Sequence, residues 1–343
     1  MPDSLNKKGY TLIEIMISIT IGLFLIAAAS ATYVVQNRSS GAQESVAEIN
    51  TQSKIALDLI ANEIRSTGFG APDNLNEEPI NNVTSMIIPI DSTTAPDAVT
   101  IVGGFRTIGT LWPAGTAPGI PCPASVSMAS SQISISYTGT EAPNMTDKRF
   151  LSIDAMEFVE VLNCTTDANL NCTAGIITLD RTISQEFPLQ DLDGDGLCET
   201  GRPVYLVEDA TFCIDANSTL RRIRRNATPG TCTGLATSDN DAIAENIEDF
   251  QIAYAVDLDD DGFADDQNGS GAFDNGDFLN GAAVADPDTI IALRINILAR
   301  TDRADRNYTG LGNPPAAIEN RNHNSTNDDF RRRWWQTVVS MRN

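Results

Sequence analysis

The most prominent pattern in the chain is a long apolar run near its N-terminus. From Ile15 to Val35 about 21 residues carry no formal charge, which is enough for one helix to cross a bilayer. Lys7 and Lys8 precede this run, so the positive-inside rule keeps the short N-terminal tail in the cytoplasm. The pattern therefore predicts a transmembrane helix over about residues 13–35, with the rest of the chain on the far side of the membrane.

Beyond the apolar run the pattern becomes amphipathic. Apolar residues recur at helical spacing and no proline interrupts them. We therefore expect one continuous helix over residues 10–66, roughly 84 Å long, whose second half packs on a globular domain. Gly41 is a weak point within this helix, and Gly68 and Gly70 mark its end.

The remaining residues, 67–343, alternate short apolar runs with polar, glycine-rich and proline-rich loops. No amphipathic helix intervenes clearly, apart from a weak candidate at residues 241–249. The pattern predicts an α+β fold, in which the long N-terminal helix packs on a largely antiparallel β-sheet globular domain. The expected strands are residues 99–102, 133–137, 150–162, 175–179, 204–207, 210–214, 220–223, 250–256 and 290–299.

Glu14 is the one carboxylate near the start of the apolar run. A charge at this position is costly in a membrane, which marks it as functional and calls for a cationic partner. If the chain were cut after Gly9, Tyr10 would carry a new α-amine one helical turn away. That amine, on this chain or on a neighbouring subunit, is the natural counter-charge for subunit docking. The alternative is a simple membrane anchor whose glutamate reaches the interface.

The segment Lys7-Lys8-Gly9-Tyr10-Thr11-Leu12-Ile13-Glu14 resembles the class III leader of type IV pilins and pseudopilins. The resemblance implies that a prepilin peptidase cuts after Gly9, which removes the leader at residues 1–9, and that Tyr10 is then N-methylated. Methylation leaves an amine positively charged, so the pairing with Glu14 survives it. The family usually has Phe at the position of Tyr10, and Tyr is also tolerated at a membrane interface.

Further segments resemble PilW-type minor pilins: residues 55–69, residues 244–254 and 291–300 on either side of an aspartate loop, and the C-terminal residues 331–343. The middle of the chain, residues 72–240, carries no motif of that kind. The resemblance implies a minor pilin of a type IV pilus that primes or supports assembly and lies near the pilus tip. Its partners would be other minor pilins, the major pilin, the prepilin peptidase and a tip adhesin.

The same resemblance implies a location in the inner membrane before assembly and in the pilus at the cell surface afterwards. The globular domain would be periplasmic and later extracellular. One alternative is a minor pseudopilin of a type II secretion system. Another is a calcium-dependent, membrane-anchored adhesion protein that never enters a filament.

Charge and composition exclude several other classes of function. The formal net charge of −23 disfavours binding to nucleic acid. The basic segment at residues 221–225 is therefore interpreted as an internal partner for acidic loops. The chain has one histidine, His323, so no Ser/His/Asp or Cys/His arrangement supports an enzyme.

Two acidic loops match the opening of a calcium-binding loop. Side-chain oxygens fall at positions one, three, five and nine, with a glycine at position six. Position twelve lacks the glutamate of an EF-hand, so we expect a shorter cage of oxygen ligands for Ca²⁺. The alternative is a pair of solvated loops without an ion. The candidate ligands are Asp191, Asp193, Asp195 and Glu199 in one loop, and Asp257, Asp259, Asp261 and Asp265 in the slightly favoured other loop.

All six cysteines follow the membrane segment, on the oxidising side, so we expect disulfides. The sequence does not choose among the many possible connectivities. We favour Cys164–Cys172 and Cys213–Cys232, because each pair closes a short polar loop between expected strands. Cys122–Cys198 would then be the remaining pair.

Overall fold

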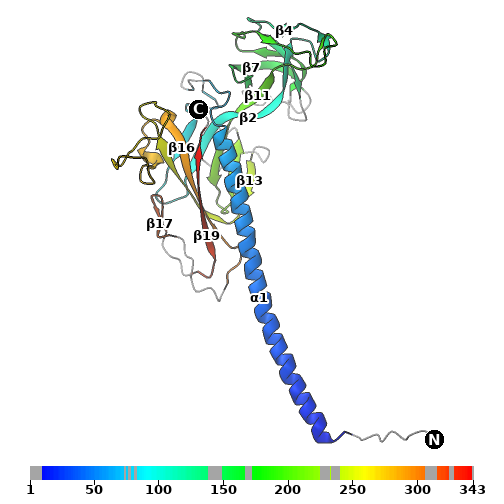
Figure 1. Ribbon diagram of the computed structural model, residues 1–343, viewed down its shortest axis with the longest axis vertical. Helices are drawn as coiled ribbons and strands as arrows, with labels where there is room; N and C mark the ends of the chain where they lie inside the picture. The colour runs from blue at the N-terminus through cyan, green and yellow to red at the C-terminus, as the bar shows by residue number, and fades with distance from the viewer. Residues whose placement is uncertain are drawn as a thin grey trace, which may run out of the picture.

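The computed structural model describes residues 10–341, apart from residues 73–74, 76–78, 81–82, 138–148, 167–171, 225–231, 233–239, 306–314 and 324–327. Figure 1 shows one long helix that carries a β-rich region at the end far from the N-terminus. The helix, α1, spans Leu12–Arg65 without a break at Gly41. Its bounds confirm the expected helix to within two residues at each end.

The C-terminal end of α1 fits closely against a glycine pair in the second strand, β2 (Ala98–Pro113). Gly68 has a positive φ of 82° and donates its N–H to the carbonyl oxygen of Val102 at 2.8 Å. Gly104 donates in turn to the carbonyl oxygen of Phe69 at 2.7 Å. A Cβ atom on Gly103 would lie 2.5 Å from the carbonyl oxygen of Ser66, so only glycine permits this approach.

Two long strands, β2 (Ala98–Pro113) and β11 (Pro203–Ile214), connect the two parts of the β-rich region. They belong to a nine-stranded antiparallel sheet in the order β1-β2-β5-β8-β7-β6-β11-β12-β13. An additional pairing of β2 with β11 closes six strands, from β2 through β5, β8, β7 and β6 to β11, into a barrel. The other strands are β1 (Ile87–Ile90), β5 (Gln132–Tyr137), β6 (Arg149–Ile153), β7 (Glu157–Thr166), β8 (Cys172–Leu179), β12 (Leu220–Arg224) and β13 (Asn240–Ala244).

The barrel has its own hydrophobic core, which includes Leu111, Ile133, Leu151, Val159 and Val204. Two short antiparallel pairs accompany it. These are β3 (Ile120–Pro121) with β10 (Leu197–Cys198), and β4 (Ser125–Val126) with β9 (Phe187–Pro188). The barrel lies beyond the C-terminal end of α1, at the end of the molecule opposite the membrane segment (Figure 1).

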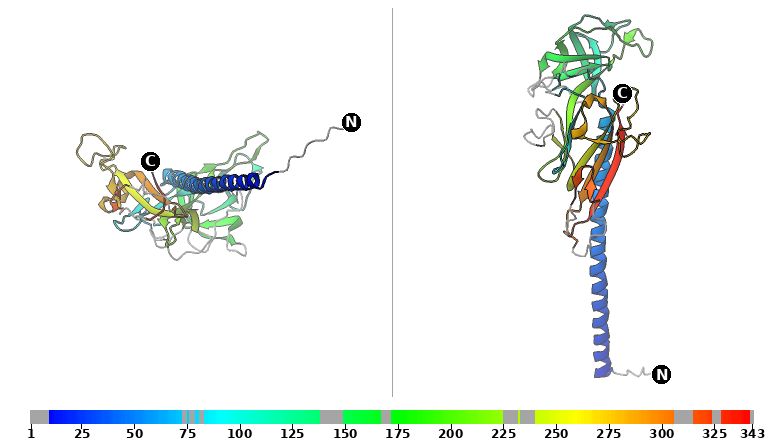
Figure 2. Two further views of the ribbon diagram at one scale, coloured as in Figure 1. Left: turned by 90° about the horizontal axis from the view of Figure 1, so that it is seen from below. Right: turned by 90° about the vertical axis from the view of Figure 1, so that its left-hand side faces the viewer.

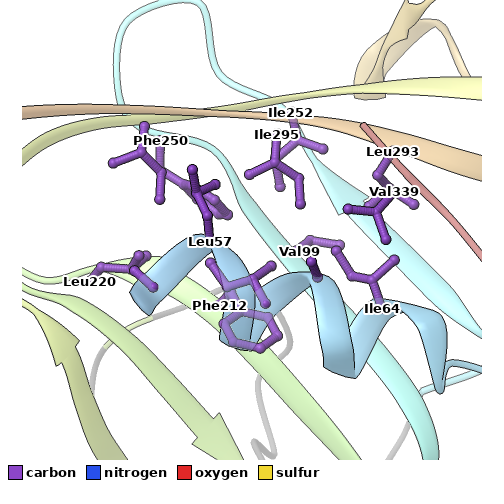
Figure 3. Packing of buried hydrophobic residues seen from close by; sticks show 14 of the residues in the cluster. Leu57, Ile64, Val99, Phe212, Leu220, Phe250, Ile252, Leu293, Ile295 and Val339 are labelled. Atoms are coloured by element: carbon purple, nitrogen blue, oxygen red, sulfur yellow. The ribbon is translucent and has the colours of Figure 1, made fainter. Parts of the chain in front are cut away.

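A second antiparallel sheet has the order β15-β14-β16-β19. Figure 3 shows the end of α1 between this sheet and the other one, with Leu57 and Ile64 facing residues of both. Leu57, Ile64 and the residues of the two sheets around them belong to the largest hydrophobic core among the described residues. This core anchors the helix to the domain. The strands are β14 (Ile247–Val256), β15 (Leu279–Asn280), β16 (Ile290–Arg300) and β19 (Arg332–Ser340).

Smaller elements complete the fold. Two single-turn 3₁₀ helices, η2 (Gly281–Ala283) and η3 (Pro287–Thr289), precede β16. A short hairpin of β17 (Ala317–Ile318) and β18 (Arg321–Asn322) precedes β19. Figure 2 shows β19 at the outer edge of its sheet and the first half of α1 protruding from the domain.

Several expected elements were placed wrongly. Residues 241–249 form no helix, because Asn246 turns the chain with a positive φ of 58° between β13 and β14. Residues 150–162 form a hairpin rather than one strand, since Asp154 and Ala155 both have a φ of 55°, as a tight hairpin turn requires. The two strands expected at 204–207 and 210–214 are one strand, β11.

Candidate functional site

The N-terminus of α1 is capped by reciprocal hydrogen bonds between Thr11 and Glu14. The Glu14 backbone N–H donates to Thr11 Oγ1 at 3.3 Å, and the Thr11 backbone N–H donates to Glu14 Oε2 at 2.8 Å. The Thr11 hydroxyl also donates to Glu14 Oε2, at 2.9 Å. This is a capping box, which satisfies two free N–H groups at the beginning of the helix.

The capping box leaves Glu14 able to bind a further group. Both contacts from Thr11 end on Oε2, and no hydrogen bond to Oε1 is found among the described residues. A carboxylate can accept several hydrogen bonds, so Oε1 can receive an amine. Tyr10 is 86% exposed beside it. Gly9 and the expected cleavage position lie outside the described residues, as does the leader at residues 1–9.

The first half of α1 exposes a continuous apolar surface. The helix includes a stretch that is long and apolar enough to cross a membrane, and none of that stretch is buried in the domain. Phe24 is 75% exposed, and every apolar side chain from Leu12 to Val35 is exposed in the same way. Such a surface requires a lipid or helix partner.

The second half of α1 is fixed to the domain by charge as well as by apolar contacts. Arg222 of β12 forms ion pairs with Glu63 in the last turns of α1 and with Asp241 of β13. Burial raises the pKa of Glu63, and the charge of Arg222 opposes that effect. Arg221 pairs instead with Asp215 at 2.5 Å. Arg221 and Arg222 of the basic segment therefore form ion pairs within the domain, as expected. Their partners are single carboxylates and not the two acidic loops that had been expected. Arg225 lies outside the described residues.

Both acidic loops fold into the same turn. In each, the first aspartate accepts the N–H of the glycine at position six: Asp191 from Gly196 at 3.0 Å, and Asp257 from Gly262 at 2.8 Å. The acid at position nine accepts the N–H of the second residue, at 2.7 Å for Glu199 and at 2.6 Å in the other loop. Positions four and six both have positive φ in each loop.

The carboxylates of each loop converge. In the first loop all four candidate acids place an oxygen within 4.8 Å of one another. In the second loop only Asp257, Asp259 and Asp265 do so, while Asp261 accepts the N–H of Phe263 at 2.8 Å. Repulsion from Asp261, followed by desolvation and Asp265, raises the pKa of Asp259. Calcium accepts irregular cages of oxygen ligands, so both loops have suitable donors.

A neighbouring loop with a similar sequence is stabilised by its own backbone. Asp266 accepts N–H groups from Gly269 and Ser270. The carboxylate of Asp277 is completely buried and accepts N–H groups from Gln267, Asn268 and Asp274. Asp277 therefore serves this loop as an internal anchor.

Sequence reasoning missed a polar contact that fixes the β17–β18 hairpin to the second sheet. Asp249 is buried and is contacted by Arg321 and by His323 Nε2, the latter at 2.6 Å. Glu319 contacts Arg294 at 2.6 Å, and its partners all come from segments distant in the sequence. No local motif could have revealed this arrangement. It gives the single histidine a structural position.

The three disulfides join Cys122 to Cys198, Cys164 to Cys172 and Cys213 to Cys232. These are the pairs favoured from the sequence. Two lie in the barrel region and the third ties the end of β11 to the loop after β12. The disulfides indicate a domain that matures outside the cytoplasm.

Two protein-family models match the chain, one in its C-terminal part and one near its N-terminus. Residues 204–343 match the family described as Type IV Pilus-assembly protein W. Residues 4–30 match the prokaryotic N-terminal methylation motif. The C-terminal part of the chain is thus similar to the PilW family, and its N-terminus carries the methylation motif. No curated protein and no solved structure matches the chain.

The two matches confirm the resemblances drawn from the leader segment, the later strands and the C-terminus. Residues 55–69 lie outside both matches, and the PilW match extends to residues 204–240, where no motif was expected. The PilW match begins in β11 and covers the second sheet with its β17–β18 hairpin, whereas most barrel strands precede it. The methylation motif includes the first part of α1 and implies processing by a prepilin peptidase and pilin partners. PilW proteins are structural proteins of the pilus system, and this chain has the features of a membrane-anchored, extracytoplasmic pilin.

Proposed function

We propose that this protein is a minor pilin that primes or supports assembly of a type IV pilus and lies near the pilus tip. The observation that carries the proposal is the contrast between the two halves of the continuous helix α1. Its first half is apolar and free of the domain, whereas one face of its second half, from Ile49 onward, is buried against the two sheets. A helix built in this way can leave the membrane and join a bundle of similar helices while it holds its own domain outside.

Glu14 is proposed to direct that step. Its free Oε1 would accept the N-terminal amine of an adjacent pilin, and Thr11 would hold the carboxylate in place. In an apolar surrounding an unpaired carboxylate is costly, so the pairing would favour entry of the helix into the filament. Other minor pilins and the major pilin supply such amines.

The barrel supports a position near the tip. It lies beyond the C-terminal end of α1, where the next subunit of a filament would otherwise stack (Figure 1). A subunit with this addition fits most easily where nothing follows it. A domain at that position could also hold a tip adhesin. The alternative of a type II secretion pseudopilin is less well supported, because the PilW match covers the entire second sheet.

We also propose that calcium binds the two acidic loops. Two loops that are separate in the sequence share one turn geometry and each gathers at least three carboxylates. Calcium outside the cytoplasm is abundant enough for weak sites to be filled. Bound calcium would offset the repulsion among these acids.

The docking role of Glu14 is tested by substituting Glu14→Ala and Glu14→Gln in the full chain. Both variants should reach the membrane at the normal level, and both should enter sheared pili at least ten-fold less often. Asp58→Asn, on the exposed face of the second half of α1, is the matched control and should behave as the parent. Normal incorporation of Glu14→Ala would refute the docking role.

A further inference from the structure

Strand β19 forms an open edge of the second sheet. It pairs along its whole length with β16, and its other side has no strand in the described part of the chain. The hydrogen bonds at its two ends set the phase of the pairing. Thr301 donates to the carbonyl oxygen of Arg331 and Met341 donates to that of Ile291, both at 2.9 Å.

This phase determines which backbone groups face the open edge. In an antiparallel pair, alternate residues direct both N–H and C=O toward the partner strand. The odd-numbered residues of β19 therefore face β16. The backbone groups of Trp334, Gln336, Val338 and Ser340 face outward, and no described residue hydrogen-bonds to them.

The edge lacks the usual protection against a further strand. Natural edge strands are commonly blocked by charges, proline or a bulge. From Trp334 to Met341 there is neither a charge nor a proline, and the register with β16 has no bulge. Trp334 is 43% exposed and Val338 is 51% exposed on the outer face of the sheet. An added strand would cover both side chains.

One end of the edge carries an available cation. Arg333 is exposed and forms no salt bridge with any residue that the structure describes. The preceding strand residue, Arg332, is instead buried and paired with Glu248 and Asp328. A strand added antiparallel to β19 would bring its C-terminal end to Arg333.

We propose that the open edge of β19 binds an extended segment of another pilus protein as an added antiparallel strand. The side chains along the edge indicate which residue types that segment would contain. It has β-branched or aromatic residues to cover Trp334 and Val338, and a carboxylate at its C-terminal end to pair with Arg333. Main-chain hydrogen bonds to Gln336 and its alternate neighbours would supply most of the binding.

A second copy of this chain fits the edge poorly. Arg331 and Arg333 line the same hollow as residues 35–50 of α1, and Val339 lies near Ile64 at the other end of the helix (Figure 3). Strand β19 therefore runs in the same direction as α1. Antiparallel pairing of two β19 strands would point the two α1 helices in opposite directions. Both helices could not then enter one membrane from the same side.

Amide hydrogen exchange of the full-length chain tests the inference. The Val338 amide is compared between the chain purified in detergent and the chain in native membranes with its partners. We expect exchange at Val338 to slow at least ten-fold in membranes. Gln336→Pro removes an outward N–H but no bond to β16, so it should abolish the slowing, whereas Gln336→Ala should preserve it.

A second variant covers the case in which Gln336→Pro does not fold. Arg333→Glu keeps the strand but repels a carboxylate, and should reduce the slowing at Val338, whereas Arg333→Lys should retain it. Equal exchange in detergent and in membranes would overturn the inference. Slowing that appears in detergent and increases with protein concentration would assign the edge to a second copy, and would also overturn it. This readout does not depend on whether pili form, so it is separate from the test of Glu14.

Discussion

Arg222 of β12 joins the domain to Glu63 near the end of α1 through an ion pair in which both side chains are largely covered. The helix joins its exposed apolar first half to the two sheets, so this contact lies where α1 is fixed to the domain. The same guanidinium also contacts Asp241 of β13, at the edge of the nine-stranded sheet. Loss of Arg222 would leave Glu63 partly buried without its cation.

Arg222→Ala should therefore lower the free energy of unfolding by about 1–3 kcal/mol, because a covered charge loses its partner. Adding Glu63→Gln should restore part of that loss, so the two effects should not add. The measurement is the denaturation midpoint of the full chain in detergent. Arg303→Ala is the control, since its pair with Asp302 is exposed and should contribute less than about 1 kcal/mol. Equal losses for both single arginine variants would contradict the assignment.

Asp97 should make stability depend on pH. It is 2% exposed where the two sheets meet and accepts the N–H groups of Ile252 and Ser92, each at 2.9 Å. Desolvation is the main cause that raises its pKa to about 7. The folded state therefore holds this proton more tightly than the unfolded state. The resulting stability is complete below pH of about 4 and is lost as the pH rises through 7.

The expected loss across that range is at most about 4 kcal/mol, since each pKa unit corresponds to about 1.4 kcal/mol. Asp97→Asn cannot ionise and should remove most of this slope, although it should also weaken one of the two N–H contacts. Urea unfolding of both proteins at pH 5 and pH 8 provides the comparison. The same pH slope in Asp97→Asn as in the parent would show that other groups cause it.

Calcium should raise the unfolding temperature of the full chain in detergent. Weak extracellular-type sites have dissociation constants of about 10⁻⁴ to 10⁻³ M, so 10 mM calcium should stabilise the fold by about 1–3 kcal/mol per filled site. Asp193→Asn combined with Asp259→Asn should reduce that gain, while Asp286→Asn outside both groups should not. A parent protein that shows no response to calcium, and no change on chelation, would rule out both sites.

The helix and its motif could be predicted because their signals are local. The apolar run, the amphipathic continuation and the glycines at 68 and 70 each lie within a few residues of the feature that they set. The capping role of Thr11 was missed, although the spacing Thr-x-x-Glu carried the signal. Most strands were located correctly, because alternation of apolar residues is also a local pattern.

The barrel could not be predicted in the same way. Its closure depends on β2 pairing with β11, about 100 residues later, through two shifts of register that no local pattern indicates. The polar residues Glu208 and Asp209 divided β11 into two expected strands, yet both are buried in one continuous strand. The contact between Asp249 and Arg321 likewise joins residues 72 positions apart. Such contacts are properties of the folded state.

The most direct test of the central claim is a count of surface pili on cells that lack this protein, with retraction active and with retraction disabled. We expect few pili while retraction is active, and recovery on return of the parent gene but not of Glu14→Ala. Few pili in both states would indicate that the protein primes assembly, and recovery once retraction is disabled would indicate that it supports assembly. An unchanged number of pili in both states would contradict the account.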